Sequence, residues 1–383
     1  MPCNLNEEIM RILFYLMISL TVTVSNDASN IISYPGDTWR KCSINEIKKL
    51  NHKKLDDLFK YAFDTNADYV TNSLILYHRD CEVKAQFANG YKRSQLHRVW
   101  SISKSVSAIL VGIAEQKGLL NREDLVADYY PKIEPTYSQS LKIRHLLQMS
   151  SGLDWKEGYE ANPLGSNVLQ MLYVDGMRDM AEYTANIPFA FAPGTRWLYS
   201  SGETNLLMGC LKKSMPEDQY AKFPWKELFE PLGIKNATWE RDSSGTFVGS
   251  SYLYLAPSDL ARIGYLYMRS GKWDHQRIVS EAWIDFNIGI APALMNQEAP
   301  EPQELAAYGA QWWLNLPNPR KKLIKEIPKA PDSLFFGSGH HGQFLAVFPE
   351  QELILVRNGK DKNESINRAE LFSLAYEVSR RDL

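Results

Sequence analysis

The sequence lacks the features that mark zinc-binding, nucleic-acid-binding and repeat proteins. It has only four cysteines in 383 residues, and no two of them show the C-x-x-C spacing of metal ligands. Lys and Arg number 43 against 45 Asp and Glu, without a basic run, so we expect no nucleic-acid partner. There is no internal repeat and no low-complexity tract. With 44% hydrophobic and 23% charged residues, the composition is that of a globular protein with ample material for a core.

The sequence also lacks an apolar run long enough to span a membrane comfortably. Its apolar N-terminal segment, residues 12–24, is shorter than the ~20 residues that a transmembrane helix needs. The segment fits the core of a secretory signal, so we predict a signal peptide at residues 1–25 and a periplasmic or secreted protein without a stable membrane span. Glu7 and Glu8 are unfavourable before such a core, and a start at Met10 would give a cleaner signal. A membrane-anchoring or buried helix is the alternative interpretation.

The four cysteines fall into three groups. Cys3 would be removed with the signal peptide. Cys42 and Cys81 flank the first strand region and could pair in an oxidising compartment. Cys210 lies in an apolar helical run and is expected to pack in the core.

The pattern of apolar residues predicts strands at both ends of the chain and helices between them. The expected strands are residues 73–77, 83–87, 311–314, 343–348 and 353–357. The expected helices are residues 47–63, 99–118, 143–149, 168–180, 204–212, 257–270 and 365–380. This order indicates an α+β fold, an antiparallel sheet flanked by helices. We assign residues 26–120 and 251–383 to the sheet domain, and residues 121–250 to an inserted, mostly helical lobe.

Ser101 and Lys104 lie at the start of the helix expected at residues 99–118, which its apolar residues at helical spacing predict to be buried and amphipathic, with Gly118 as its stop. Residues at i and i+3 share one helix face, so the hydroxyl and the amine should lie side by side. The first turn of a helix also favours a developing anion through its free N–H groups and its dipole. This arrangement suits a serine nucleophile with a lysine base. The S-x-x-K spacing occurs about once or twice by chance in a chain of this length, so it needs partners elsewhere.

Tyr199 is the first candidate partner. It follows a Pro-Gly turn and precedes an apolar helix that begins near Thr204, so its side chain could project from a loop. Near a lysine ammonium its phenol pKa would fall, and it could then carry a proton. The alternative is a packing role, since the chain has 20 tyrosines.

The glycine-rich stretch 337–344, GSGHHGQF, is the second candidate partner. Its glycines permit close approach of a ligand to the backbone, and the N–H of Gln343 could join the N–H of Ser101 in an oxyanion hole. In an extended segment, the adjacent His340 and His341 would point to opposite faces. No third ligand is suggested nearby, so we predict no metal site.

Taken together in chain order, these three stretches resemble the serine-active β-lactamase-related hydrolases. That family includes class C β-lactamases, DD-peptidases, carboxylesterases and 6-aminohexanoate-dimer hydrolases. The resemblance extends from about Ser73 to the C-terminus and includes the framework stretches 143–155 and 255–273. It implies the fold of the serine β-lactamases and penicillin-recognising proteins.

The resemblance also implies catalytic roles. Ser101 matches the acylated nucleophile, and Lys104 matches the lysine that assists its deprotonation. Tyr199 matches the tyrosine of the Tyr-x-Asn motif, which relays protons to the leaving group. Whether the lysine or the tyrosine is the general base stays open, because a coupled pair titrates as a unit.

The substrate-binding positions depart from the β-lactam-specific pattern. His340, His341 and Gly342 match the Lys-Thr-Gly triplet, and the N–H of Gln343 follows it into the oxyanion hole. His340 replaces a lysine, and a histidine of ordinary pKa ~6.5 is mostly neutral at neutral pH. Ser201 replaces the asparagine of Tyr-x-Asn. Both changes favour a neutral ester or amide over a β-lactam.

We therefore predict an exported serine hydrolase that cleaves a small-molecule ester or amide without a metal or organic cofactor. A carboxylesterase or a 6-aminohexanoate-dimer hydrolase fits best. The alternatives are a β-lactamase or DD-peptidase acting on β-lactams or cell-wall peptides, and a non-catalytic binding module on the same scaffold. Trp155, Trp197 and Trp313 could line an apolar pocket, although tryptophans are more often core or rim residues.

Overall fold

The computed structural model describes residues 33–158, 165–296, 306–318, 325–362 and 365–380. The predicted signal peptide and Met10 lie outside these ranges. The chain divides into a first unit, Met1–Tyr34, and a second unit, Pro35–Leu383, to which the following description applies. Among the described residues, no helix combines the length and the apolar character that a membrane crossing requires.

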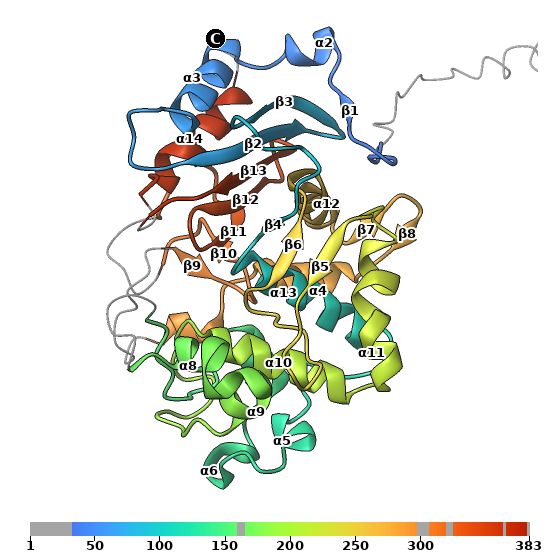
Figure 1. Cartoon of the computed structure of the whole chain (residues 1–383), viewed down its shortest axis with the longest axis vertical. Helices are drawn as coiled ribbons and strands as arrows, with labels where there is room; N and C mark the ends of the chain where they lie inside the picture. Colours follow the sequence, from blue (N-terminus) through green and yellow to red (C-terminus); the bar gives the residue numbers. More distant parts are fainter. Residues whose placement is uncertain (1–32, 159–164, 297–305, 319–324, 363–364, 381–383) are drawn as a thin grey trace, which may run out of the picture. The chain divides into compact units, whose positions relative to one another are not determined.

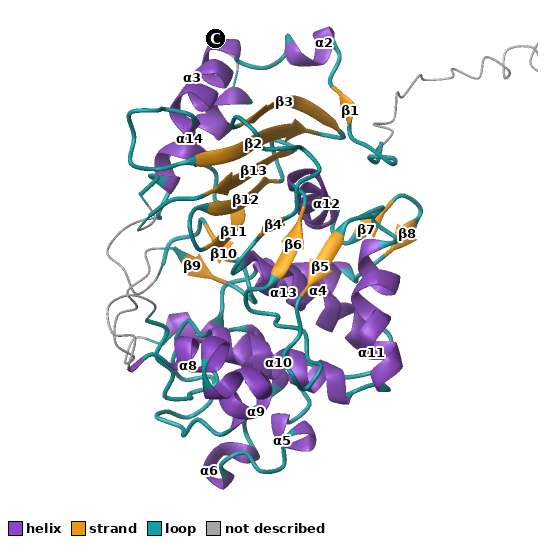
Figure 2. Ribbon diagram, viewed as in Figure 1, coloured by secondary structure: helices purple, strands orange, loops and turns teal. Residues whose placement is uncertain are grey.

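Strands and helices of the described residues are labelled in Figure 1 and coloured by type in Figure 2. The strands are β1 (Arg40–Lys41), β2 (Thr71–His78), β3 (Cys81–Phe87), β4 (His97–Arg98), β5 (Ala237–Trp239), β6 (Leu253–Leu255), β7 (Lys272–Trp273), β8 (Gln276–Arg277), β9 (Ala307–Tyr308), β10 (Trp313–Leu314), β11 (Phe335–Gly339), β12 (Gln343–Phe348) and β13 (Leu353–Gly359). The α-helices are α2 (Ile44–Ile47), α3 (His52–Ala62), α4 (Ile102–Gln116), α5 (Val126–Tyr129), α6 (Pro135–Ser138), α7 (Ile143–Leu147), α8 (Asn167–Tyr173), α9 (Met180–Ala185), α10 (Ser201–Lys213), α11 (Glu217–Pro224), α12 (Pro257–Met268), α13 (Glu281–Ile288) and α14 (Arg368–Val378). The other helical segments are η2 (Asp175–Arg178), η3 (Trp225–Phe229) and η4 (Pro292–Met295).

The large sheet is built from both ends of the chain, which confirms the predicted α+β class. Its strand order is β1-β3-β2-β13-β12-β11-β10-β9, and every neighbouring pair is antiparallel except β1 and β3. The early strand β2 pairs with the late strand β13, with Ile75 opposite Val356. A small second sheet has the order β4-β6-β5, and a third consists of β7 and β8.

Helices cover both faces of the large sheet (Figure 2), and the strand sequence reflects this. Alternate residues of β12, such as Phe344 and Phe348, join the core formed with α3 and α14. The residues between them, Leu345 and Val347, face α12. Because apolar side chains are needed on both faces, β12 reads as an apolar run and not as an alternating pattern.

Helix α4 is the central helix of the molecule. All residues from Ile102 to Ala114 are buried, and the helix packs against β11, β12 and α10. The Trp283 indole Nε1 donates to the carbonyl of Ala108 at 3.0 Å, which ties α13 to this helix. The chain leaves the helix at Gly118 with φ +68°, as the predicted stop requires.

Two predicted helices differ from the observed ones by more than a shift of a few residues at their ends. Residues 168–180 form α8, the 3-10 turn η2 and the start of α9, because the Asp179 side chain caps a new helix by accepting from the N–H of Glu182. The helix predicted at 47–63 begins at His52, where Asn51 caps it. The assignment of residues 121–250 to a separate lobe stays a prediction.

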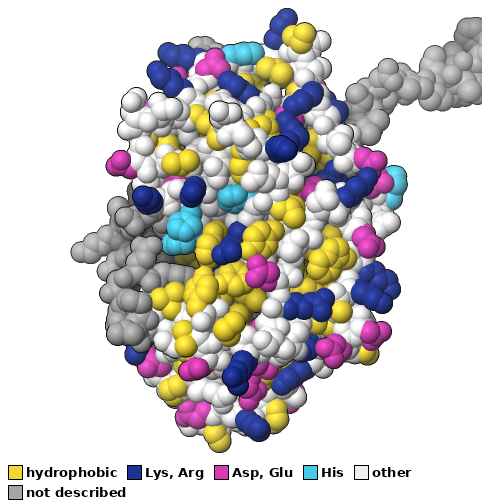
Figure 3. All heavy atoms as spheres, viewed as in Figure 1, with side chains coloured by type: hydrophobic (Ala, Val, Ile, Leu, Met, Phe, Trp, Pro, Cys, Tyr) yellow, Lys and Arg dark blue, Asp and Glu magenta, His cyan; other side chains and the backbone are white. Residues whose placement is uncertain are grey.

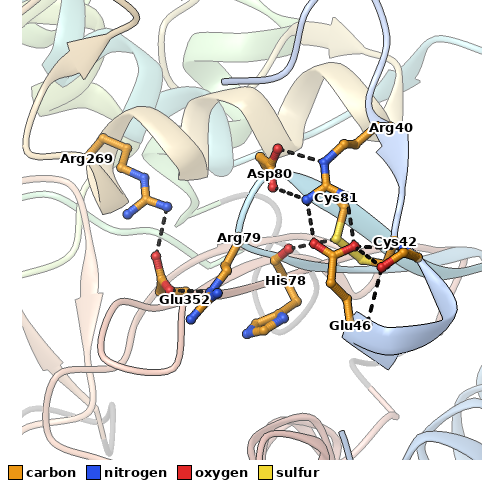
Figure 4. A network of polar contacts seen from close by, with 10 residues as sticks. Arg40, Cys42, Glu46, His78, Arg79, Asp80, Cys81, Arg269 and Glu352 are labelled. Carbon is orange, nitrogen blue, oxygen red and sulfur yellow. Dashed lines mark hydrogen bonds and ion pairs between the residues drawn. A yellow bond between two sulfur atoms is a disulfide. The ribbon is translucent and has the colours of Figure 1, made fainter. Parts of the chain in front are cut away.

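A disulfide joins Cys42 and Cys81 next to the parallel pair β1 and β3. Figure 4 shows the Arg40 guanidinium beside it, paired with Asp80 at 2.6 Å and with Glu46 at 2.6 Å. These two carboxylates and the Cys81 sulfur lie close enough to hold an ion. The sulfur is already bonded and the carboxylates already face a guanidinium, so this cluster is an ion-pair network and not a metal site.

Candidate active site

Ser101 and Lys104 meet at the N-terminus of α4. Ser101 is half-buried at the N-cap position of the helix, while Lys104 is 1% exposed. The Lys104 Nζ lies 3.0 Å from the Ser101 Oγ. A hydroxyl at the start of a helix therefore has an amine within hydrogen-bond distance, which is the geometry of a nucleophile and its proton acceptor.

The Lys104 amine has two further hydrogen-bond partners. Its Nζ lies 3.0 Å from the Ser201 Oγ and 3.1 Å from the carbonyl oxygen of Ser250. Burial lowers the pKa of Lys104 to about 8, and the charge of Glu157 opposes this shift. More of the amine is thus neutral near neutral pH than in an exposed lysine, which favours a role as general base.

Tyr199 presents the face of its ring to this amine. The Lys104 Nζ lies 4.9 Å from the ring centroid. The ring stacks on Trp313 with centroids 5.4 Å apart and meets Tyr308 edge-on at 5.9 Å. These aromatic contacts fix the ring beside Lys104. Trp197, 6% exposed, belongs to the core of this aromatic group.

Glu157 is a site residue that the sequence did not suggest. Its carboxylate accepts from the Ser201 N–H at 2.8 Å, from the Ser201 Oγ at 2.5 Å and from the Trp155 Nε1 at 2.5 Å. Trp155 is 3% exposed, and a Cβ on Gly202 would lie 2.4 Å from its ring, so the start of α10 needs a glycine there. Trp155 and Trp197, which could have lined an apolar pocket, are both buried.

His340 and His341 lie on one side of the chain, so the expectation of opposite faces is wrong. Their ring centroids are 3.9 Å apart, and both rings contact Trp100, at 5.3 Å and 5.7 Å. The segment is not extended but forms the turn between β11 and β12, with φ +62° at His341 and +75° at Gly342. The turn thus brings both imidazoles beside the residue that precedes Ser101.

The side chain of Gln343 stabilises this turn. The two N–H groups of its Nε2 are shared among three carbonyl oxygens, those of both turn histidines at 3.1 Å and that of Gly359 at 2.9 Å. Gln343 on β12 lies opposite Gly339 on β11. A Cβ added to Gly339 would lie 2.3 Å from the carbonyl oxygen of Val99. The start of β12 is therefore close to the segment that carries Ser101. The use of the Gln343 N–H as an oxyanion donor stays a prediction.

Comparison with known proteins gives consistent matches. A family model described as Beta-lactamase matches residues 65–371. The chain is 22% identical over 292 residues to a 6-aminohexanoate-dimer hydrolase of Paenarthrobacter ureafaciens, covering 73% of this chain and 70% of that protein. The structure of EstCE1, a hydrolase with promiscuous acyltransferase activity, matches with a TM-score of 0.67 and 14% identity over 88% of this chain and 100% of that one. A class C beta-lactamase mutant matches with a TM-score of 0.60 and 17% identity over 88% and 99%.

Proposed function

Because the chain belongs to the Beta-lactamase family and is a serine hydrolase, we propose that it is exported and cleaves a small ester or amide through an acyl intermediate on Ser101. One observation carries this proposal: the buried amine of Lys104 lies 3.0 Å from the Ser101 Oγ. An amine held there with a lowered pKa can accept the proton of the hydroxyl as the hydroxyl attacks a carbonyl.

In the acylation step, the Ser101 Oγ attacks the substrate carbonyl carbon and its proton passes to Lys104. The carbonyl oxygen becomes an oxyanion, for which the backbone N–H groups of Ser101 and Gln343 are the proposed donors. Loss of one such donor typically raises the barrier by about 2.7–4 kcal/mol. The proton then moves from Lys104, or through Tyr199, to the leaving group, and the bond between carbonyl carbon and leaving group breaks.

In the deacylation step, a water molecule attacks the acyl-serine ester. Lys104 or Tyr199 takes the proton of this water and returns a proton to the Ser101 Oγ as the acid departs. Tyr199 is placed to share this role, because the Lys104 Nζ lies 4.9 Å from the centroid of its ring. The enzyme thus returns to its starting protonation state.

We propose a small ester or amide of the kind that carboxylesterases or 6-aminohexanoate-dimer hydrolases take. His340 stands where the β-lactam-specific relatives have a lysine, which weakens the case for an anionic group at this point. Hydrophobic side chains gather near the middle of the face in Figure 3, with histidine side chains beside them. The similarity to a 6-aminohexanoate-dimer hydrolase supports an amide as the bond that is cleaved.

Export is supported by the disulfide between Cys42 and Cys81, since such bonds persist in oxidising compartments. The N-terminal apolar segment, residues 12–24, supplies the proposed signal. Expression of the full chain followed by intact-mass analysis of the extracytoplasmic fraction tests this point. A mature protein lacking about 25 residues supports export, and an uncleaved protein found only in the cytoplasm contradicts it.

The hydrolase itself is tested with p-nitrophenyl acetate, p-nitrophenyl butyrate and one penicillin. We expect a burst and continued turnover of the esters, an acyl adduct on Ser101 by intact mass, and loss of both in Ser101→Ala. Ser94→Ala, at an exposed position ahead of the site, is the matched control and should behave like the wild type. Slow stoichiometric penicillin labelling without ester turnover would indicate a DD-peptidase or sensor instead, and no adduct from any of the compounds would indicate a binding module.

A further inference from the structure

We propose that Glu157 is a positioning residue that orients the proton-accepting lone pair of Lys104 toward Ser101 and stabilises the ammonium formed when the proton arrives. The inference rests on the proposed function, in which Lys104 takes the Ser101 proton. It concerns a residue in the loop after α7, 44 positions before its partner Ser201.

The first step of the argument is the direction of the hydrogen bonds. Ser201 has a single hydroxyl proton, and that proton is donated to Glu157 at 2.5 Å. The Ser201 Oγ can therefore only accept from Lys104, at 3.0 Å. The backbone N–H of Ser201 also donates to Glu157, so the carboxylate holds both groups of this serine in one orientation.

The second step concerns the neutral amine, which has two N–H donors and one lone pair. The Ser201 Oγ is restricted to accepting by Glu157, and the Ser250 carbonyl oxygen can only accept, at 3.1 Å. These two acceptors use both donors of the neutral Lys104. The lone pair is left for the third neighbour, the Ser101 Oγ at 3.0 Å, whose proton it receives. Glu157 thereby selects the one arrangement in which Lys104 accepts from the nucleophile.

The third step is the charge balance around Lys104. Glu157 is the acidic group whose charge favours the Lys104 ammonium. Glu203, on α10, is buried against Ser151, and burial raises its pKa well above the ordinary value, which favours its neutral form. Tyr199 presents its ring face to the amine. Among the described residues facing Lys104, Glu157 is thus the side chain that can offset the new positive charge.

The test is Glu157→Gln, which keeps the size of the side chain but removes its charge and one acceptor. The amide oxygen cannot take both Ser201 protons as the carboxylate does, so the Ser201 hydroxyl can turn its proton toward Lys104. We expect kcat/KM for p-nitrophenyl acetate to fall about 10–100-fold, a part of the ~10²–10⁴-fold that a positioned base contributes.

The pH profile separates this role from general damage to the site. Glu157 favours the charged form of Lys104, so its removal lowers the Lys104 pKa and moves the acidic limb of kcat/KM to lower pH. We expect a shift of about one pH unit, as for opposite charges ~4–6 Å apart. A merely structural defect would lower the plateau and leave the midpoint in place. Glu157→Asp, which keeps the charge, should restore the wild-type midpoint.

The matched control is Asp154→Asn, which removes an exposed carboxylate from the same loop. It should leave rate and midpoint unchanged. Ser201→Ala removes the intermediate hydroxyl, so the orienting part of the Glu157→Gln effect should be absent in this background and the two losses of rate should be less than additive. Independent roles would give additive losses. A wild-type rate and midpoint in Glu157→Gln, or an equal shift in Asp154→Asn, overturns the inference.

A second readout does not depend on turnover. An NMR titration of lysine labelled with ¹³C at Cε, with the Lys104 signal identified by its absence in Lys104→Ala, should show a lower pKa in Glu157→Gln. An unchanged titration overturns the inference even if activity falls. Failure of the proposed function is seen separately, as a wild-type protein whose Ser101 forms no adduct with the esters.

Discussion

The turn that carries His340 and His341 depends on an ion pair with no solvent access. The side chains of Arg357 and Asp361 are both 0% exposed, and they form two hydrogen bonds of 2.8 and 2.9 Å. Arg357 also donates to the carbonyl oxygen of Gly342 at 2.7 Å. The backbone carbonyl of Asp361 lies 2.8 Å from the Nδ1 of His341. We predict that this pair stabilises both the fold and the site.

The perturbation that isolates the charge is Asp361→Asn. The amide keeps the shape and can still accept from the N–H of Val70, which lies 3.1 Å from the Asp361 Oδ1. What it loses is the attraction to Arg357, about 4 kcal/mol for charges 4 Å apart at an effective dielectric of ~20. Removing one partner of a buried pair typically costs ~3–5 kcal/mol, because the other charge stays buried and unpaired. The two estimates agree, and we expect the free energy of unfolding to fall by about 3–5 kcal/mol.

Urea titration with the disulfide intact measures this loss, and kcat/KM of the folded protein reports on the turn. In the double variant Arg357→Met with Asp361→Leu, neither charge remains. Its loss in free energy of unfolding should therefore be smaller, by about 2 kcal/mol or more, than the sum of the losses in the single variants Arg357→Met and Asp361→Leu. Arg79→Met is the control, because the Arg79–Glu352 pair in Figure 4 is exposed and should contribute less than about 1 kcal/mol. Asp361→Asn within ~1 kcal/mol of the wild type, or additive losses in the double variant, would refute the reasoning.

Three further predictions follow from single contacts. Burial lowers the pKa of Lys104 to about 8, and only the neutral amine accepts a proton. The rate of acylation, measured by stopped flow, should therefore rise with pH around a midpoint near 8, and a flat profile from pH 6.5 to 9.5 contradicts this. Cys42→Ser removes the disulfide to Cys81, which closes a loop between residues 39 positions apart, and this should lower the free energy of unfolding by about 4 kcal/mol. Equal urea midpoints for the wild type with and without reductant would disprove this prediction. Gly202→Ala should lower both stability and kcat/KM, because the new Cβ would lie 2.4 Å from the Trp155 ring. This clash should outweigh the ~1 kcal/mol by which alanine favours a helix over glycine. A more stable and fully active variant would show that the ring moves aside without cost.

Elements fixed by their own residues could be predicted from the sequence. Strand β12 occupies residues 343–348 as predicted, because its run of apolar residues is needed on both faces of an internal strand. Helix α4 is predicted at 99–118 and observed at Ile102–Gln116, because its apolar residues recur with helical spacing. The α+β pattern predicts that early and late strands share one antiparallel sheet, whereas the pairing of β2 with β13 and its register could not be read from either strand alone.

The turn at His340 and His341 shows where such reasoning fails. Adjacent residues in a strand point to opposite faces, but the same two residues in a turn can lie on one side. The choice depends on Gly342, on the side chain of Gln343, and on Arg357 from the next strand. Contacts that form only after the sheet is assembled therefore decide the direction of both imidazoles, and no local pattern contains that information.

The site itself divides in the same way. Ser101 and Lys104 could be paired from the sequence because one helical turn brings positions i and i+3 together. The acceptors that use the other donors of Lys104 come from Ser201 and Ser250, 97 and 146 residues away along the chain. Spacing thus predicts that the amine is near the hydroxyl but not which way the proton can move between them. That direction is set by acceptors such as Ser201, and through it by Glu157, so chains with the same S-x-x-K motif can differ greatly in rate when these distant acceptors differ.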